Sequence, residues 1–317
     1  MAKGFFTQGV VVLLRRAPSL DEIAATLRRH VVVTRTDDAA ALDLAGPSLR
    51  IPYRPASNGY VAIDVQPRVW PDHMGDPRNE PMLFGAWSMG HFGPFAFPGG
   101  LQRAAAHAWS WADGRNVPSQ HRAFVRVRLT YLFGARDDAR VIPEDCDPAH
   151  ELRFVTGVAR TLLDHEAALA YFNPNGEVLA DRAHLDAVLE GSAALQTLPI
   201  NVWCNVRFFN AADGWFMMDT VGMAQLDQRD SEACFPGGRY EPGEVSHFLL
   251  NVGLYLAEHG DVIADGDTMD GPGGVPWRAT RVDECRAEPP RAVLRWLPLD
   301  GTRPPRALVV PGGAAGS

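Results

Sequence analysis

The sequence has no excess of positive charge and no apolar run long enough to cross a membrane. Lys and Arg number 30 against 38 Asp and Glu, which gives a formal net charge of -8 at pH 7. Broad nucleic-acid binding requires a basic surface that displaces counterions, so this balance argues against it. A membrane-spanning helix needs ~20 consecutive apolar residues, and no segment approaches that length. We therefore expect a chain that binds neither nucleic acid nor membrane.

Cysteine is scarce, and the few thiols are far apart in sequence. The apolar run from Val10 to Leu14 is too short for the core of a signal peptide and ends at Arg15. Widely spaced cysteines without a CxxC pair exclude a dense disulfide framework, so we expect reduced thiols and a cytoplasmic protein. The four cysteines are Cys146, Cys204, Cys234 and Cys285.

Motifs that carry known chemistry are also missing. The sequence has no Walker loop, Rossmann glycine fingerprint, nucleophile elbow or HExxH helix. We therefore expect no catalytic residue, no bound metal and no cofactor. Hydrophobic residues make up 46% and charged residues 21% of the 317 positions, a balance typical of a folded globular protein with one large domain or two ordinary ones.

The N-terminal part is expected to contain a compact unit followed by an irregular connection. Residues 1–68 read as a β-α-β-β-β unit, with a helix that begins at the capping box of Ser19 and Glu22. Residues 69–121 are rich in Pro, Gly and aromatic residues, and a helix is expected over 101–111. Strands of the first unit are expected at residues 9–14, 31–34, 49–51 and 60–65.

The remaining sequence predicts a C-terminal α+β domain over residues 122–300 and a flexible tail over 301–317. Its clearest feature is an antiparallel hairpin, with strands at 200–208 and 215–223 around a glycine turn. Because the two strands of a hairpin are antiparallel, this feature argues against an all-parallel sheet. The fold class is therefore α+β, with mixed, largely antiparallel sheets packed with helices, and a relationship between two α/β halves stays open. Helices are expected after the caps Asp147 and Asp181 and from Pro242 to Glu258.

The acidic stretch from Asp261 to Asp270 has two interpretations. Its four carboxylates, together with glycine, could gather around Ca²⁺ or Mg²⁺. The spacing is not that of an EF-hand, however, and Asp side chains commonly accept hydrogen bonds from nearby amides in such loops. We favour the structural interpretation for this loop.

Two further polar features are expected to be structural. Cys204 alternates with Val202 and Val206, which predicts a buried thiol rather than a nucleophile. On the helix from Pro242, the residues Glu244, His247 and Asn251 lie opposite the apolar stripe, which predicts a solvated face.

Aromatic residues are the more suggestive signal. The connection contains Trp70, Trp87, Trp109 and Trp111 with several methionines between them. Aromatic residues and methionine are enriched at protein interfaces. A core uses the same residues to fix an irregular segment, and the sequence alone does not separate the two roles.

The C-terminal part resembles a known bacterial family. The similarity rests on the stretch 198–206, on Asp219–Met223 with the following Asp230-Ser231-Glu232, and on the stretch 244–252 that leads into 260–268. These motifs resemble the bacterial domain of unknown function 4261. The resemblance implies a bacterial cytosolic protein, and such domains often look like those encoded beside polymorphic or type VI toxins.

The resemblance and the composition together suggest a non-catalytic immunity protein that neutralises a cognate toxin, one that is basic and acts in the cytoplasm. The alternative is a metal- or small-ligand-dependent enzyme or receptor that uses the acidic loop from Asp261 to Asp270. The candidate partner-binding residues are Trp70, Trp87, Asp265, Asp267 and Asp270.

Overall fold

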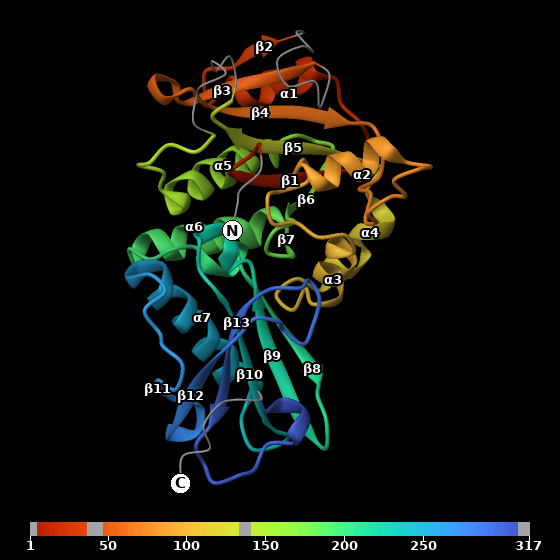
Figure 1. The fold of residues 1–317 in the computed structure, drawn as a ribbon. Helices are drawn as coiled ribbons and strands as arrows, with labels where there is room; N and C mark the ends of the chain where they lie inside the picture. The colour runs from red at the N-terminus through yellow and green to blue at the C-terminus, as the bar shows by residue number, and fades with distance from the viewer. Residues whose placement is uncertain (1–4, 37–46, 133–140, 310–317) are drawn as a thin grey trace. The chain divides into compact units, whose positions relative to one another are not determined.

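The computed structural model describes residues 5–36, 47–132 and 141–309. The chain divides into two compact units, Met1–Trp203 and Cys204–Ser317. Each unit contains a mostly antiparallel sheet packed with helices (Figure 1), so the expected α+β class is confirmed. In the described ranges, no helix is both long and apolar enough to cross a membrane.

The N-terminal unit is built on a sheet of seven strands, counted over the described residues, in which all neighbouring strands are antiparallel. Strand β5 lies between β4 and β1, so a segment far along the chain completes the sheet that the first strand begins. In spatial order the strands are β2 (Thr34–Thr36), β3 (Ser48–Arg54), β4 (Gly59–Gln66), β5 (Ala123–Thr130), β1 (Gln8–Leu14), β6 (Ala168–Asn173) and β7 (Val178–Ala180).

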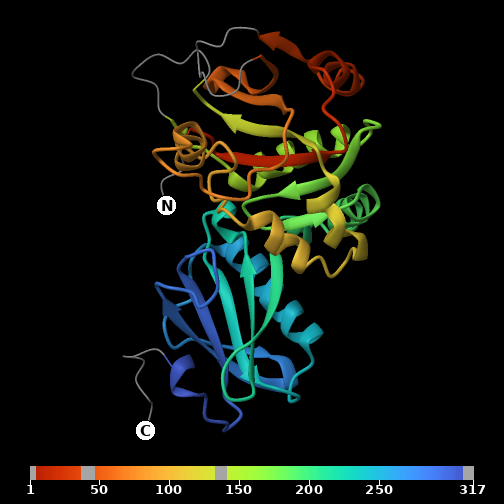
Figure 2. The same ribbon diagram turned by 90° about the vertical axis from the view of Figure 1, so that its right-hand side faces the viewer.

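Helices cover both faces of this sheet (Figure 2), because successive side chains of a strand point to opposite faces. In β1, Val11 and Leu13 join the apolar cluster that also holds residues of α2, α3 and α4. Helices α1 and α5 pack against each other, α5 also packs on β1, and α6 lies against α5 and β7. The helices are α1 (Leu20–Leu27), α2 (Pro81–Ser88), α3 (Gly100–Ala106), α4 (Val117–Gln120), α5 (Pro148–Leu162) and α6 (Arg182–Ala194).

Helix starts in this unit follow from side-chain caps that the sequence predicts. Ser19 accepts a hydrogen bond from the amide of Glu22, and the Glu22 carboxylate accepts one from the amide of Ser19, so the capping box is confirmed. Asp147 and Asp181 cap α5 and α6 in the same way. Each cap satisfies an amide that the first helical turn leaves without a backbone partner.

The C-terminal unit has a sheet of six strands, again counted over the described part of the chain. Strands β10 and β13 are parallel, and the other neighbouring pairs are antiparallel. Helix α7 (Pro242–His259) covers one face. In spatial order the strands are β11 (Thr268–Gly271), β12 (Val275–Val282), β13 (Val293–Pro298), β10 (Asp230–Pro236), β9 (Trp215–Val221) and β8 (Asn205–Asn210).

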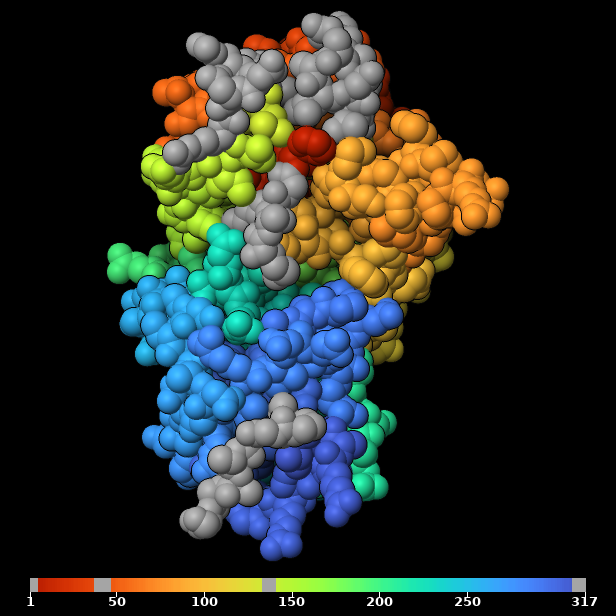
Figure 3. Space-filling model, viewed as in Figure 1, coloured from red at the N-terminus to blue at the C-terminus, as the bar shows by residue number. Residues whose placement is uncertain are grey.

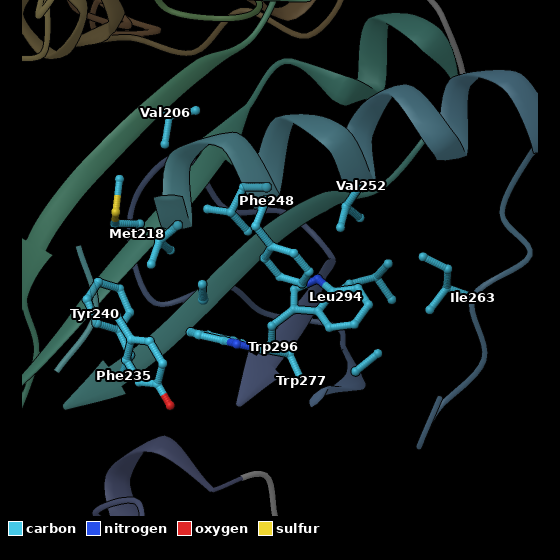
Figure 4. Close-up of a cluster of buried hydrophobic side chains, with 14 of the residues drawn as sticks. Val206, Met218, Phe235, Tyr240, Phe248, Val252, Ile263, Trp277, Leu294 and Trp296 are labelled. Atoms are coloured by element: carbon cyan, nitrogen blue, oxygen red, sulfur yellow. The ribbon is translucent and has the colours of Figure 1, made fainter. Parts of the chain in front are cut away.

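The core of the C-terminal unit lies between α7 and the sheet. Phe248 and Val252 of α7 point toward Leu294, Trp277 and Trp296 of the sheet (Figure 4). The Phe248 ring lies 5.5 Å from Trp277 and 5.3 Å from Trp296, measured between ring centroids. This packing fixes the rotation of α7, and therefore which of its residues face solvent.

Unit boundaries differ from those that the sequence suggests. Residues 122–203 belong with the N-terminal unit, because β5, β6 and β7 pair within its sheet. The connection over 69–121 is not a separate piece either, since its helices pack on that same sheet. Because this sheet combines strands that are distant in sequence, local amino-acid composition does not indicate where the N-terminal unit ends.

Three local expectations also differ from the structure. Ile200–Val202 forms a 3₁₀ turn and strand β8 begins only at Asn205. The amides of Val202 and Trp203 bond within the turn, and the Tyr171 hydroxyl donates to the carbonyl of Val202. The helix expected over 101–111 ends at Ala106, and the strand expected at 31–34 begins at Thr34.

The expected tail over 301–317 is partly packed. Leu308 is buried with Trp215, Met217 and Cys234, so the chain remains attached to the sheet at least to this residue. Residues 310–317 of that expectation lie outside the described residues.

The two sheets do not support a strand-by-strand duplication. In both sheets a strand (β1 or β10) is followed by a helix and then by a meander whose last strand (β5 or β13) pairs with that strand. The meander has three strands in the C-terminal unit and returns parallel, whereas it has four in the N-terminal unit and returns antiparallel.

Candidate functional site

One region of the C-terminal surface is rich in exposed carboxylates, of which Asp261 is paired with Arg281 and Arg229. Residues 241–270, which form α7, the loop after it and most of β11, contain no Lys or Arg. All of their acidic side chains are exposed, and α7 with its loop is visible on the surface in Figure 3, in light blue. We call this surface the acidic face. Its carboxylates belong to Glu241, Glu244, Glu258, Asp261, Asp265, Asp267 and Asp270.

The apolar stripe of α7 holds the acidic face in place. The stripe is buried against the sheet, at no more than 7% exposure for Phe248 and 0% for Val252. Glu244, His247 and Asn251 lie on the other side of the helix and are exposed, so the predicted solvated face is confirmed. The position of these side chains is therefore set by a rigid core rather than by a loop.

Partly exposed aromatic and apolar groups interrupt the acidic face at the end of α7. Tyr255 is 40% exposed and stacks on His259, with ring centroids 4.3 Å apart. Nδ1 of His259 lies 3.0 Å from the carbonyl oxygen of Tyr255. Val262, two residues after the helix, is 52% exposed. A tyrosine of this kind, flanked by charges, is a common anchor in protein interfaces.

The acidic loop is held by its own carboxylates. Oδ1 of Asp265 accepts a hydrogen bond from the amide of Arg281 at 2.9 Å, and Oδ2 of Asp267 accepts one from the amide of Ala264 at 2.8 Å. Asp261 forms an ion pair with Arg281 at 3.0 Å. These contacts are the amide-capping arrangement that the structural interpretation predicts.

Asp270 differs from the other loop residues because it lies in a strand. It is exposed on β11, at the edge of the sheet, opposite Pro276. Among the residues that the structure describes, no group of three or more His, Cys, Asp or Glu side chains is placed to hold a metal ion.

On the sheet face opposite α7 the structure reveals a buried row of charged side chains. Register places Arg207 of β8 opposite Asp219 of β9, Asp219 opposite Glu232 of β10, and Glu232 opposite Arg295 of β13. Arg207 donates to Asp219 at 2.9 and 2.6 Å, and Arg295 donates to Glu232 at 2.9 and 2.8 Å. We call these four residues the charged row; none is more than 5% exposed.

The segment before β13 closes over the charged row. Arg291 donates to Asp219 at 2.7 Å and forms an ion pair with Asp230 at 3.2 Å. Burial opposes the charge of Arg291, yet the adjacent carboxylates of Asp230 and Asp219 raise its pKa. Burial also raises the pKa of Asp230, and Arg291 only partly offsets that effect. The carbonyl of Glu288 accepts a further hydrogen bond from Arg207 at 2.6 Å.

Three of the four residues of the charged row and the whole of the acidic face lie in a segment that matches a protein family. Residues 219–297 match the model of the family Domain of unknown function (DUF4261). The resemblance expected from the sequence is confirmed for this part of the chain. No curated protein and no solved structure matches the chain.

The DUF4261 segment includes α7, the acidic loop and three members of the charged row, while Arg207 lies outside it. Sequence reasoning missed the charged row although part of its signal was visible. Arg207 and Asp219 stand symmetrically about the hairpin turn, and a cross-strand ion pair follows from that register. Their burial could not be foreseen, because it depends on the segment after β12.

Trp70 and Trp87 lie outside the DUF4261 segment, and their predicted role in partner binding is not supported by their position. They are 4% and 6% exposed and belong to the core of the N-terminal unit. Trp70 contacts Trp87, Phe92 and Phe124 in edge-to-face geometry at 5.2–5.9 Å. They fix the irregular connection, which is the second of the two roles that the sequence left open.

Cys204 is buried as predicted, at 3% exposure, but it precedes β8 rather than lying within a strand. Burial, and then the nearby negative charge of Asp230, raise the pKa of its thiol well above the ordinary value. A nucleophilic cysteine requires the opposite environment, and the predicted burial of this thiol is confirmed.

Proposed function

We propose that this chain is a non-catalytic cytoplasmic protein that binds and neutralises a bacterial toxin, and that the acidic face is its docking surface. The observation that supports this proposal most directly is the exposure of seven carboxylates within residues 241–270, a stretch without Lys or Arg. An inhibitor of this kind needs no catalytic group. It needs a preorganised surface with a few anchors and a complementary field.

Charge is distributed unevenly between the two units. Residues 204–317 contain 16 Asp and Glu and 10 Arg, so they account for six of the eight net negative charges. A surface of this sign attracts a basic partner and accelerates its diffusional encounter. The partner is therefore expected to be a basic protein, as toxins that act on nucleic acids or nucleotides often are.

Rigidity and an anchor support the same proposal. The core beneath α7 holds the outward residues in fixed positions, which limits the entropy lost on binding. Tyr255 offers a large ring beside Glu258, and Val262 adds apolar area nearby. A central aromatic anchor with charged neighbours matches the anatomy of interfaces that depend on a few residues.

The second candidate is an enzyme or receptor that uses the loop from Asp261 to Asp270 to hold a cation or small ligand. One carboxylate oxygen of Asp265 and one of Asp267 accept a hydrogen bond from a backbone amide, and Asp261 pairs with Arg281. These contacts favour the binding-surface proposal, because a hard cation requires carboxylate oxygens that converge on one point.

The proposal is tested by co-expressing the chain with each protein encoded beside it, in a host whose growth that protein inhibits. Co-expression should restore growth, and the two proteins should co-purify. In surface plasmon resonance the triple variant Glu244→Gln, Glu258→Gln, Asp270→Asn should lower the on-rate about three- to tenfold at low salt and leave the off-rate nearly unchanged. The matched control is Glu190→Gln, an exposed glutamate of α6 in the other unit. The on-rate of the unmodified protein should also fall as salt rises.

Two results would overturn the proposal. One is failure of the chain to rescue growth or to co-purify with any adjacent gene product. The other is a triple variant whose on-rate equals that of Glu190→Gln, which would place the docking surface elsewhere.

A further inference from the structure

A cavity of about 420 Å³ lies on the side of the C-terminal sheet that carries the charged row. Arg295 and Val282 of the sheet contribute to its wall, Ala307 and Val309 of the C-terminal segment form its rim, and it is open to solvent. The volume falls in the range of sites for small ligands. This cavity is separate from the acidic face, which lies on the α7 side of the same sheet.

Arg295 brings an incompletely bonded guanidinium to the cavity wall. The side chain is 5% exposed, and its Nε and Nη2 both donate to a single oxygen of Glu232. Over the described residues, no hydrogen bond is formed by its Nη1. This N–H group is accessible from the cavity, so a ligand acceptor there would replace the water that otherwise bonds it.

A second guanidinium lines the cavity next to Arg295. The backbone amide of Arg286 donates to the other oxygen of Glu232 at 2.6 Å, which ties the cavity wall to the charged row. Its side chain is exposed and donates to the carbonyl of Ala307. Cys285 also lines the cavity, and its Sγ lies 3.3 Å from Nη1 of Arg291. Two guanidinium groups, those of Arg286 and Arg295, therefore line the cavity.

We propose that this cavity binds a small organic monoanion, a carboxylate with a short apolar part. The carboxylate accepts hydrogen bonds from Nη1 of Arg295 and from Arg286, an arrangement that guanidinium groups favour. Val282, Ala307 and Val309 contact the apolar part. Glu284 also lines the cavity, and its charge disfavours anions that carry more than one negative charge.

The test uses the full-length chain with butyrate as the probe and butyramide as its neutral counterpart. Isothermal titration calorimetry at constant ionic strength, adjusted with chloride, should show saturable binding of butyrate and none of butyramide. Arg286→Gln should weaken butyrate binding about tenfold, because a charge-assisted hydrogen bond is lost. Glu284→Gln should strengthen it about threefold, because a like charge is removed. The matched control Arg303→Gln, an exposed arginine outside the cavity lining, should change nothing.

Arg295→Lys removes Nη1 but keeps a cation beside Glu232, and it should abolish binding while circular dichroism shows a folded protein. If that variant does not fold, Arg286→Gln and Glu284→Gln still decide the question. The proposal is overturned if butyrate does not saturate by about 50 mM, a Kd far weaker than a built site should give. Equal binding of butyrate and butyramide, or opposite signs for the two exposed variants, would also overturn it. None of these results depends on a protein partner, so the proposed toxin neutralisation stands or fails separately.

Discussion

Asp219→Asn should destabilise the C-terminal unit strongly, because Asp219 compensates two buried cations. Its Oδ1 accepts from Nε of Arg207 at 2.9 Å, and its Oδ2 accepts from Nη2 of Arg207 at 2.6 Å and from Nη2 of Arg291 at 2.7 Å. Asn removes the negative charge and turns one of these acceptors into a donor that faces a guanidinium. Asp230 still pairs with Arg291, whereas Arg207 loses the carboxylate that faces it and keeps its hydrogen bond to the carbonyl of Glu288.

The magnitude follows from burial. Asp219 and Arg207 are both 0% exposed, and removal of one partner from a buried ion pair costs about 3–5 kcal/mol. The C-terminal unit has 114 residues. With an unfolding entropy of about 2.1 cal/mol/K per residue, the Tm of a unit this size should fall by roughly 12–20 °C.

Differential scanning calorimetry measures the shift, and hydrogen exchange of the α7 amides assigns it to the C-terminal unit. Asp270→Asn is the matched control, since the same change at an exposed carboxylate should alter stability by no more than about 0.5 kcal/mol. The double variant Arg207→Met, Asp219→Leu should recover part of the loss, because neither member of the pair remains uncompensated. A loss below about 1 kcal/mol for Asp219→Asn would refute the buried charged row as described.

Three further predictions concern the thiols and the acidic loop. Cys204 should react with a thiol reagent far more slowly in the native protein than after unfolding, because the thiol is buried and its pKa is raised; fast native labelling would contradict this. Millimolar Ca²⁺ or Mg²⁺ should leave the Tm nearly unchanged, and a rise that is lost in Asp265→Asn, Asp267→Asn would show a cation site instead. Burial raises the pKa of Cys234 to about 12, so its stabilising effect is fully present below the unfolded-state pKa near 9 and is lost as pH rises from there toward 12. Cys234→Ala should therefore make the loss of stability over this pH range shallower, by up to about 1.4 kcal/mol per pH unit, in urea titrations at each pH.

Local signals in the sequence predicted local structure well. Ser19, Asp147 and Asp181 cap the helices that they were expected to cap, because a cap depends on only three or four neighbouring residues. The apolar period of α7 likewise predicted which face is buried and which is solvated. The acidic face is therefore largely readable from the sequence.

Features that depend on distant segments were not readable. The insertion of β5 between β4 and β1 decides where the N-terminal unit ends, yet no residue near position 122 encodes it. Residues 200–202 alternate like a strand but form a 3₁₀ turn, because a tertiary hydrogen bond from Tyr171 competes with the local preference. Arg207 alternates with apolar residues, a pattern that predicts a solvent-exposed side chain. In the structure the segment after β12 covers Arg207, and the residue is buried.

The two proposed sites share one sheet but occupy opposite faces of it. Glu232 of β10 and Arg295 of β13 belong to the charged row on one face, while their neighbours Ala233 and Trp296 pack beneath α7 on the other. A ligand in the cavity that displaces the Arg295 side chain would thus act on β13, the strand that also packs beneath α7 and the acidic face. Coupling between two sites must be reciprocal, so if butyrate changes the affinity for the protein partner, the partner must change the affinity for butyrate by the same factor. Equal partner affinity with and without saturating butyrate would instead show that the sheet isolates its two faces, and the cavity would then have a role of its own.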